Sequence, residues 1–228
     1  MPLKVVPRRD RKLYRVVKRG ERRRCRRGEV LYRAGDPAGH LYLVTAGHLR
    51  LIQEEDDGGG GVGGVGGRAV AIACAWEMVG EEALLPDARR RTTAVAGEST
   101  ELIVLGGRAT QGALQTSRKT LEAFLRAKEE ELALARTLGE SRRSGGARRR
   151  LGALLLHLAH RQGSRKGEAI QVAIPLTHQL LADLSHSHRS TVTTILNDWI
   201  YAGILVEGDV GIRILKPGAL RSGEIPFR

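Results

Sequence analysis

Short apolar runs alternate with turn residues between residues 28 and 105. The run at residues 41–44 (Leu-Tyr-Leu-Val), for example, is followed by Ala46-Gly47 and then by residues 49–52 (Leu-Arg-Leu-Ile). Turn signals about every 8–12 residues are typical of an all-β barrel or sandwich, and we expect such a domain here. The glycine-rich stretch 58–67 offers few side chains that can pack, which predicts a flexible hairpin tip between two strands.

A different pattern follows between residues 110 and 140, where Gly and Pro become rare and Leu, Ala, Glu, Lys and Arg dominate. This composition and spacing predict a long helix with one apolar stripe. The stripe consists of Leu121, Phe124, Leu125, Leu132, Leu134, Ala135 and Leu138, and Lys128 interrupts it. The stripe can be buried against the β-domain or against a second copy of the helix. The length of the segment favours a dimerisation helix.

A basic, glycine-containing segment ends this helix. Residues 141–150 read Ser-Arg-Arg-Ser-Gly-Gly-Ala-Arg-Arg-Arg, and Gly145-Gly146 indicates a hinge. We expect a second domain to begin near residue 147, with a helix whose apolar residues are Leu151, Leu154, Leu155 and Leu158.

Residues 176–201 have the pattern of two helices joined by a short turn. Thr177 stands after Pro175 where an N-cap is expected. The polar sequence at 185–188 (Ser-His-Ser-His) predicts the turn. The inward faces are Leu180, Leu181 and Leu184 on the first helix and Val192, Ile195, Leu196 and Trp199 on the second.

The second helix leaves a polar outer face with no acidic residue before Asp198. Hydroxyl and guanidinium groups donate to phosphates and to base edges in a major groove. The outer-face residues are Arg189, Ser190, Thr191, Thr193, Thr194 and Asn197. Residues 203–215 then predict a β-hairpin around a Gly-Asp-Val-Gly turn. This order favours a winged helix-turn-helix that binds DNA; the alternative is a plain αα-hairpin with a small sheet.

Charge supports a polyanionic partner but does not locate its site. The chain of 228 residues has 38 Lys and Arg against 25 Asp and Glu, a formal net charge of +13. Residues 1–27, which include the N-terminal arm, hold 13 basic and 2 acidic residues, a net charge of +11. The arm either binds phosphates or is simply solvated.

Other classes of protein find little support in the sequence. Cys25 and Cys74 stand outside any metal-ligand spacing, so we expect no metal site. No apolar run reaches the roughly 18 residues that span a membrane, and the N-terminal residues lack the apolar core of a signal peptide, so we expect a cytoplasmic protein. Catalytic constellations are also missing from the pattern, and His186 and His188 have no metal-spaced partner. We therefore do not expect an enzyme.

Residues 176–196 resemble, without a gap, the helix-turn-helix of the cyclic-AMP receptor/FNR (CRP/FNR) regulators. Arg189-Ser190-Thr191-Val192 occupies the place of that family's Arg-Glu-Thr-Val. The resemblance extends over roughly residues 25–217. It includes Gly28, Gly35 and Gly47, which fall where the family's β-roll turns need glycine. It implies that Thr177, His178 and His188 join the six outer-face residues in contacting DNA.

A second stretch, Gly80-Glu81-Glu82-Ala83-Leu84-Leu85 with Arg91-Thr92, resembles the family's phosphate-binding cassette. The resemblance implies an anion site in which Arg91 forks onto a cyclic phosphate and Thr92 adds a hydroxyl. Glu81 would accept from a ribose hydroxyl, and the N–H groups of Glu82 and Ala83 would face phosphate oxygens. The alternative is that Arg91 pairs internally with Glu81 or Glu82 and that the pocket is empty.

The sequence departs from the family at positions that matter for effector and operator. Ala135 and Arg136 stand where cyclic-AMP-responsive members have a Thr-Ser pair that reads adenine. Ser190 and Thr194 replace base-reading Glu and Arg, so the operator should differ from the familiar one.

These patterns together predict an α+β chain with four parts. They are a basic arm (1–24), a cyclic-nucleotide-binding-like β-roll (25–109), a dimerisation helix with hinge (110–143) and a winged helix-turn-helix domain (144–228). We expect a homodimeric transcription regulator that binds a palindromic double-stranded operator, contacts RNA polymerase and activates transcription without an obligatory effector. The alternative is gating by a cyclic nucleotide, with cyclic AMP as the candidate ligand.

Overall fold

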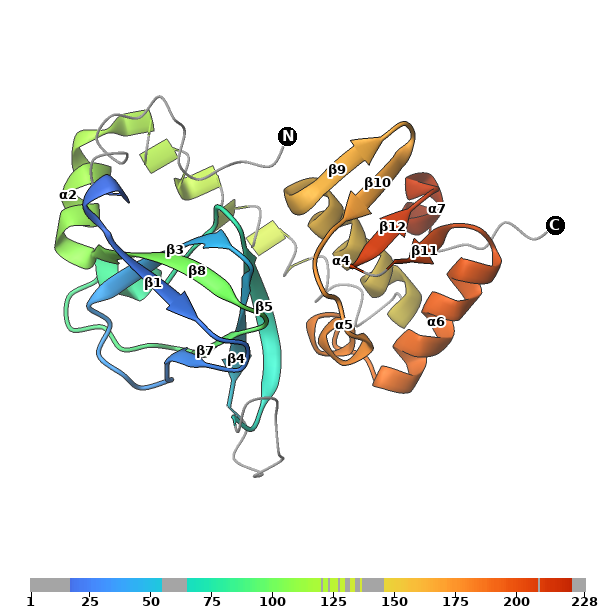
Figure 1. The fold of residues 1–228 in the computed structure, drawn as a ribbon, viewed down its shortest axis with the longest axis horizontal. Coiled ribbons are helices and arrows are strands. Elements are labelled where there is room, and N and C mark those ends of the chain that lie inside the picture. The colour runs from blue at the N-terminus through green and yellow to red at the C-terminus, as the bar shows by residue number, and fades with distance from the viewer. Residues whose placement is uncertain are drawn as a thin grey trace. The chain divides into compact units, whose positions relative to one another are not determined.

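The computed structural model describes residues 17–54, 65–119, 146–208 and 210–222, together with helical positions 121, 122, 124–126, 128, 129, 132, 133 and 136. The chain divides into two compact units, Lys4–Ala127 and Lys128–Arg228. Figure 1 traces the elements in chain order.

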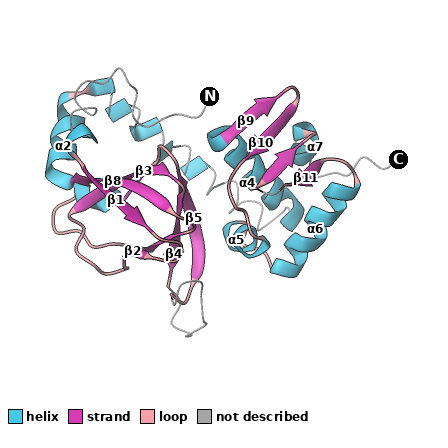
Figure 2. Ribbon diagram, viewed as in Figure 1, coloured by secondary structure: helices cyan, strands magenta, loops and turns pink. Residues whose placement is uncertain are grey.

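Two four-stranded antiparallel sheets make up the N-terminal unit (Figure 2), in the orders β1-β8-β3-β6 and β2-β7-β4-β5. The strands are β1 (Glu21–Cys25), β2 (Val30–Tyr32), β3 (His40–Ala46), β4 (His48–Gln53), β5 (Arg68–Cys74), β6 (Met78–Val79), β7 (Thr93–Ala96) and β8 (Thr100–Gly106). A short 3-10 helix, η1 (Glu81–Leu84), and the helix α2 (Gly107–Thr116) also belong to this unit. The predicted β-domain is confirmed.

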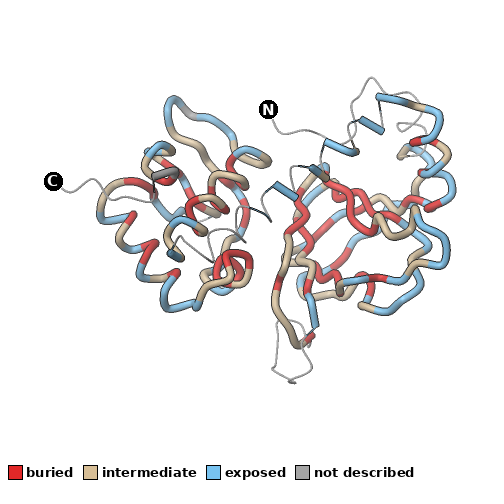
Figure 3. Tube along the Cα trace, turned by 180° about the vertical axis from the view of Figure 1, so that it is seen from behind, coloured by how far each residue is buried: buried red, intermediate tan, exposed pale blue. Residues whose placement is uncertain are grey.

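Strand β3 is buried on both faces, which explains its unbroken apolar run. Tyr42 and Val44 face the core between the sheets. Leu41 and Leu43 face a second cluster, which η1 and Phe124 help to cover. The buried positions of both units are red in Figure 3. Side chains alternate between the two faces of a strand, so a strand covered on both sides has no polar alternation to display.

Tight turns join the strands where the glycine pattern predicts them. Gly47 links β3 to β4 with φ +74, and a Cβ there would lie 2.6 Å from the carbonyl oxygen of Ser99. Only glycine tolerates both conditions. Strands β4 and β5 pair antiparallel, as expected for the flanks of the glycine-rich segment. The predicted tip itself falls mostly at 55–64, outside the described residues.

The first sheet begins earlier than the basic arm suggests. Strand β1 starts at Glu21 and pairs with β8 in the register Glu21↔Val104 to Cys25↔Thr100. Residues 21–24, which the sequence analysis places in the arm, therefore belong to the β-domain. Charged side chains commonly mark edge strands, and three consecutive arginines hide the apolar signal that defines a strand. Residues 1–16 lie outside the described part of the chain.

The helical stretch begins at Gly107, three residues before the expected start. Ser117 is extended, with φ −131 and ψ 100, and so separates α2 from the helical positions after it. Leu121, Leu125 and Leu132 of the predicted stripe are 40%, 56% and 50% exposed. Leu134, Ala135, Leu138 and the hinge residues 141–145 are outside the described residues.

The C-terminal unit packs four described helices against a four-stranded sheet of order β11-β12-β10-β9. Its elements are α4 (Ala147–Gln162), β9 (Gly163–Lys166), β10 (Ala169–Val172), α5 (His178–Leu184), α6 (Arg189–Tyr201), β11 (Leu205–Glu207), β12 (Ile212–Ile214) and α7 (Pro217–Ser222). The predicted helix at 147, the helix pair and the hairpin wing are confirmed. The β9–β10 hairpin and α7 were not foreseen. No helix in the described ranges is long and apolar enough to cross a membrane.

Candidate functional site

The candidate DNA-binding element of the C-terminal unit consists of α5, α6 and the turn between them. The backbone N–H of Leu180 donates to Thr177 Oγ1 at 3.1 Å, so Thr177 caps α5 as predicted. All seven residues predicted to face inward on the two helices are at most 5% exposed. Because these positions are fixed by packing, the opposite face of α6 is presented to solvent.

That face of α6 is polar and carries no acidic residue in its first turn. Arg189, Ser190, Thr191, Thr194 and Asn197 are exposed on it. Within the described residues, the guanidinium of Arg189 has no hydrogen-bond or ion-pair partner, so it is available to a ligand outside the chain. A helix of this kind suits the major groove, where side chains near the helix start reach base edges and phosphates.

Two of the predicted DNA-contacting residues, His178 and Thr193, instead form hydrogen bonds within the C-terminal unit. His178 Nδ1 lies 2.8 Å from Thr193 Oγ1, and its Nε2 lies 3.0 Å from a carboxylate oxygen of Glu207 on β11. Thr193 also donates to the carbonyl of Arg189 at 3.0 Å. His178 and Thr193 therefore tie α5, α6 and the wing together, which suits positioning better than direct contact. His188, at the N-cap of α6, is exposed as expected.

Arginines at the start of α4 hold the helix-turn-helix, a role that the sequence analysis missed. Arg150 donates from Nε to the carbonyl of Ser185 at 2.8 Å, and from Nη2 to His186 O and Ser187 Oγ at 3.2 Å each. Arg148 forms an ion pair with Asp198 of α6. Its guanidinium carbon lies 5.9 Å from the ring centroid of Trp199. Both arginines join the first turn of α4 to segments more than 30 residues away.

The predicted cassette forms η1 and the extended segment before β7. Gly80 precedes η1 with φ +82. The backbone N–H of Ala83 donates to Gly80 O at 3.1 Å, and so it is not directed at a phosphate as the resemblance implied. Glu82 accepts the backbone N–H of Arg91 at 3.2 Å and faces the guanidinium of Arg90 at 3.4 Å. Glu81 is partly buried, and Thr92 lies beside Tyr32.

Arg90, and not Arg91, points into the β-domain. The extended segment at 88–90 pairs with the loop at 35–38: Arg90 N–H donates to Asp36 O at 2.9 Å, and Arg90 O accepts from Gly35 N at 2.9 Å. Side chains alternate along such a segment, so Arg89 and Arg91 are exposed while Arg90 is 4% exposed. An internal ion pair with Glu82 is present, but Arg90 forms it and not Arg91, for which the sequence predicted it as the alternative.

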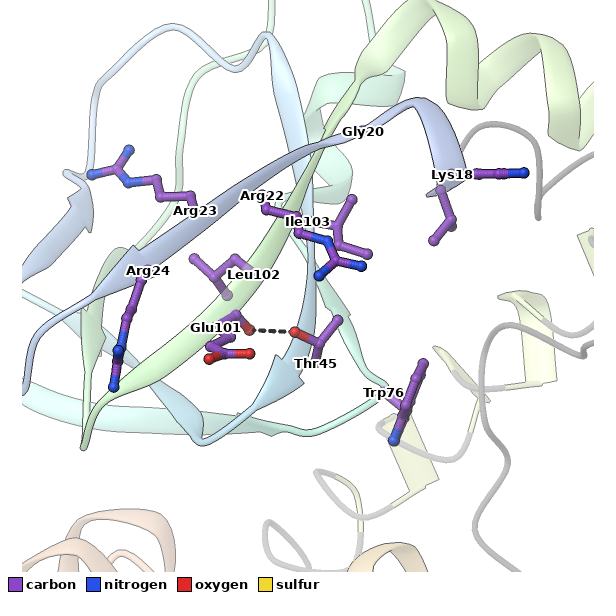
Figure 4. A pocket seen from close by; sticks show the side chains of 11 residues that line it. Lys18, Gly20, Arg22, Arg23, Arg24, Thr45, Trp76, Glu101, Leu102 and Ile103 are labelled. Atoms are coloured by element: carbon purple, nitrogen blue, oxygen red, sulfur yellow. Dashed lines mark hydrogen bonds between the residues drawn. The ribbon is translucent and has the colours of Figure 1, made fainter.

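A hollow of about 870 Å³ lies next to β1, β3 and β8. Figure 4 shows the side chains that line it. Arg22 and Arg24 extend from β1 beside it, and Thr45 donates to Glu101 O at 3.1 Å. Trp76, 42% exposed, lies at its edge. The hollow shares no residue with the predicted cassette. A second hollow, of about 740 Å³, lies between η1 and α2, and Ala83, Leu84 and Leu85 of the cassette line it. Neither of these two hollows is lined by Arg91 or Thr92.

Two family models cover most of the chain. Residues 22–117 match the cyclic nucleotide-binding domain, and residues 149–222 match the Crp-like helix-turn-helix domain. The cyclic AMP receptor protein of Thermus thermophilus is 31% identical over 214 residues, which are 91% of this chain and 88% of that protein. A stretch of 76 residues is also 37% identical to the lysophospholipase nte1 of Neurospora crassa, of which it covers 5%.

Solved structures agree on the fold. A CooA mutant from Carboxydothermus hydrogenoformans superposes with a TM-score of 0.69 at 21% identity, over 91% of this chain and 88% of the other. The c-di-GMP responsive regulator CLP of Xanthomonas campestris gives a TM-score of 0.64 at 22% identity, over 89% and 97%. With both domain models and a full-length relative in agreement, the chain belongs to the CRP/FNR family of DNA-binding transcription regulators.

Proposed function

We propose that this regulator binds a palindromic operator as a homodimer, with α6 in the major groove of each half-site. The exposed polar face of α6 carries the proposal, with Arg189 at its start exposed and without a partner among the described residues. Arg189, Ser190, Thr191, Thr194, Asn197 and His188 contact DNA in this proposal, while Thr177, His178 and Thr193 position them. A dimer places two recognition helices one DNA turn apart, roughly 34 Å.

The dimer rests on the stripe of the helical stretch. Leu121, Leu125 and Leu132 share one face at helical spacing and are at least 40% exposed in the single chain. An apolar stripe of this kind is stable in water when a second helix covers it. A symmetric dimer also explains why the operator is palindromic.

The regulator also acts without an obligatory cyclic nucleotide in our proposal. Arg91, which the resemblance expects to bind the phosphate, is exposed, and its neighbour Arg90 already donates a hydrogen bond to the carbonyl oxygen of Gly80 in the cassette. Arg136 stands where a hydroxyl would read adenine. The alternative, gating by cyclic AMP, is favoured by the relative named a cyclic AMP receptor protein. We further propose activation through RNA polymerase, and a cytoplasmic site of action where the DNA lies.

The test begins with selection of bound sequences from a random DNA pool by the full chain. The proposal predicts an inverted repeat and a complex of two chains per duplex. Adding cyclic AMP or cyclic GMP should leave operator affinity unchanged, and Arg91→Ala should leave it nearly intact. A large rise in affinity with cyclic AMP that Arg91→Ala abolishes establishes the alternative. Arg22→Ala, which removes an exposed arginine of β1, is the matched control for lost charge, and transcription in vitro from the selected operator tests activation.

A further inference from the structure

The interior of the cassette is lined by groups that attract a cation. Around the guanidinium of Arg90 lie the carbonyl oxygens of Gly80 and His40 and a carboxylate oxygen of Glu82, at 3.1, 2.6 and 3.4 Å. Two aromatic faces complete the surroundings: the guanidinium carbon is 4.4 Å from the ring centroid of Tyr32 and 5.5 Å from that of Tyr42. Carbonyls, carboxylates and aromatic faces all present negative potential.

The bound guanidinium is well matched to this environment. Arg90 is 4% exposed, and a buried charge is costly unless it is paired and hydrogen-bonded. Nη1 and Nη2 meet the three oxygens, and the two rings lie 5.6 Å apart in a stacked arrangement. Only Nε lacks a hydrogen-bond partner among the described residues. Burial raises the pKa of Tyr32 well above its ordinary value, so this ring stays neutral.

The same arrangement is poorly suited to a phosphate. The N–H of Ala83 is occupied by Gly80 O, and the N–H of Arg91 by Glu82. A phosphate entering this space meets the carboxylate of Glu82 and two carbonyl oxygens, and like charges repel strongly where water is excluded. Gly80 is also held close to Arg90, since a Cβ there would lie 2.5 Å from Nη1.

We infer that the cassette of this chain is a binding site for a guanidinium group, and that the side chain of Arg90 is the ligand that occupies it. The side chain links the cassette to β3 and to the tyrosine pair, joining segments that a ligand would otherwise have to join. The inference rests on the proposed function, because the side chain of Arg90 can occupy this site permanently only if the regulator does not need a nucleotide there. It also assigns the site a chemistry opposite to that of an anion pocket.

Arg90→Ala in the full chain empties the site, and methylguanidinium is the probe. We expect Arg90→Ala to lower the melting temperature and methylguanidinium to restore most of the loss saturably at millimolar concentration. Methylammonium at the same concentration should restore much less, because it lacks the planar fork. Wild type and Arg91→Ala, the matched exposed neighbour, should show neither the loss nor the rescue. A folded Arg90→Ala that methylguanidinium does not stabilise overturns the inference.

A second series decides the matter even if Arg90→Ala does not fold. A cation site predicts melting temperatures in the order wild type, then Arg90→Lys, then Arg90→Met, because lysine keeps the charge and methionine keeps only the apolar chain. Removing one partner of a buried ion pair is destabilising because the other charge is left without its partner, so Arg90→Met as stable as wild type overturns the inference. The proposed function fails separately, if wild type needs cyclic AMP to bind its operator.

Discussion

Removing the side chain of Arg150 should loosen the helix-turn-helix. Its guanidinium donates hydrogen bonds to the carbonyl oxygens of Ser185 and His186 and to the hydroxyl of Ser187, all in the turn. It also fastens His186, which has the left-handed φ of +50 that non-glycine residues avoid. A hydrogen bond from a charged donor contributes about 1.5–3 kcal/mol, but these three share one group, so we expect Arg150→Ala to cost about 3 kcal/mol. For a unit of this size that corresponds to roughly 15 °C in melting temperature.

Tryptophan fluorescence follows this transition. Trp199 is fully buried in the C-terminal unit, and the chain's other tryptophan can be silenced by Trp76→Phe. Arg149→Ala is the matched control because Arg149 is the exposed neighbour of Arg150. Arg150→Lys should fall between them, since an ammonium cannot satisfy separate carbonyls as a fork does. If Arg150→Ala has the same melting temperature as Arg149→Ala, the turn does not depend on this contact and the reasoning is wrong.

Three further changes test other parts of the structure. Burial lowers the pKa of His157 from 6.5 to about 4. As the pH falls, the unfolded chain therefore binds a proton at a higher pH than the folded chain does. The free energy of unfolding is unaffected above pH 6.5 and falls by about 3 kcal/mol towards pH 4. Urea unfolding across this range should show that His157→Gln removes much of the loss. Gly80→Ala, at φ +82 and against Arg90, should cost about 1–3 kcal/mol, measured as a lower melting temperature. Leu125→Glu should give monomers by light scattering and weaken operator binding; an intact dimer would exclude the stripe as the interface.

The helix-turn-helix could be predicted because its local pattern and its packing agree. Leu180, Leu181 and Leu184 recur at helical spacing, and Thr177 has the chemistry of a cap, so helix start and buried face follow from neighbouring residues alone. The β-domain follows similarly from its turn glycines and apolar runs. Strand β1 could not be predicted in this way. Its arginines lie on an edge strand, and its partner strand, β8, is about 80 residues further along the chain.

The cassette shows where sequence reasoning reaches its limit. Arg90 and Arg91 are neighbours of identical chemistry, and the choice between them depends on how the segment at 88–90 pairs with the loop at 35–38. A shift of one residue in an extended segment exchanges inside for outside. The contacts of Arg150 and His178 likewise join segments that local periodicity does not relate.

The central claim, that α6 reads the operator, is tested most directly by base preference. Wild type, Arg189→Ala and Thr191→Ala are to be compared on the selected operator and all its single-base variants at two salt concentrations. Arg189→Ala should lose discrimination at one base pair per half-site, worth about 1–3 kcal/mol. Thr191→Ala should weaken all variants equally, since a short hydroxyl near the helix start suits a phosphate. If Arg189→Ala binds every variant with the ranking and affinity of wild type, α6 is not the helix in the groove.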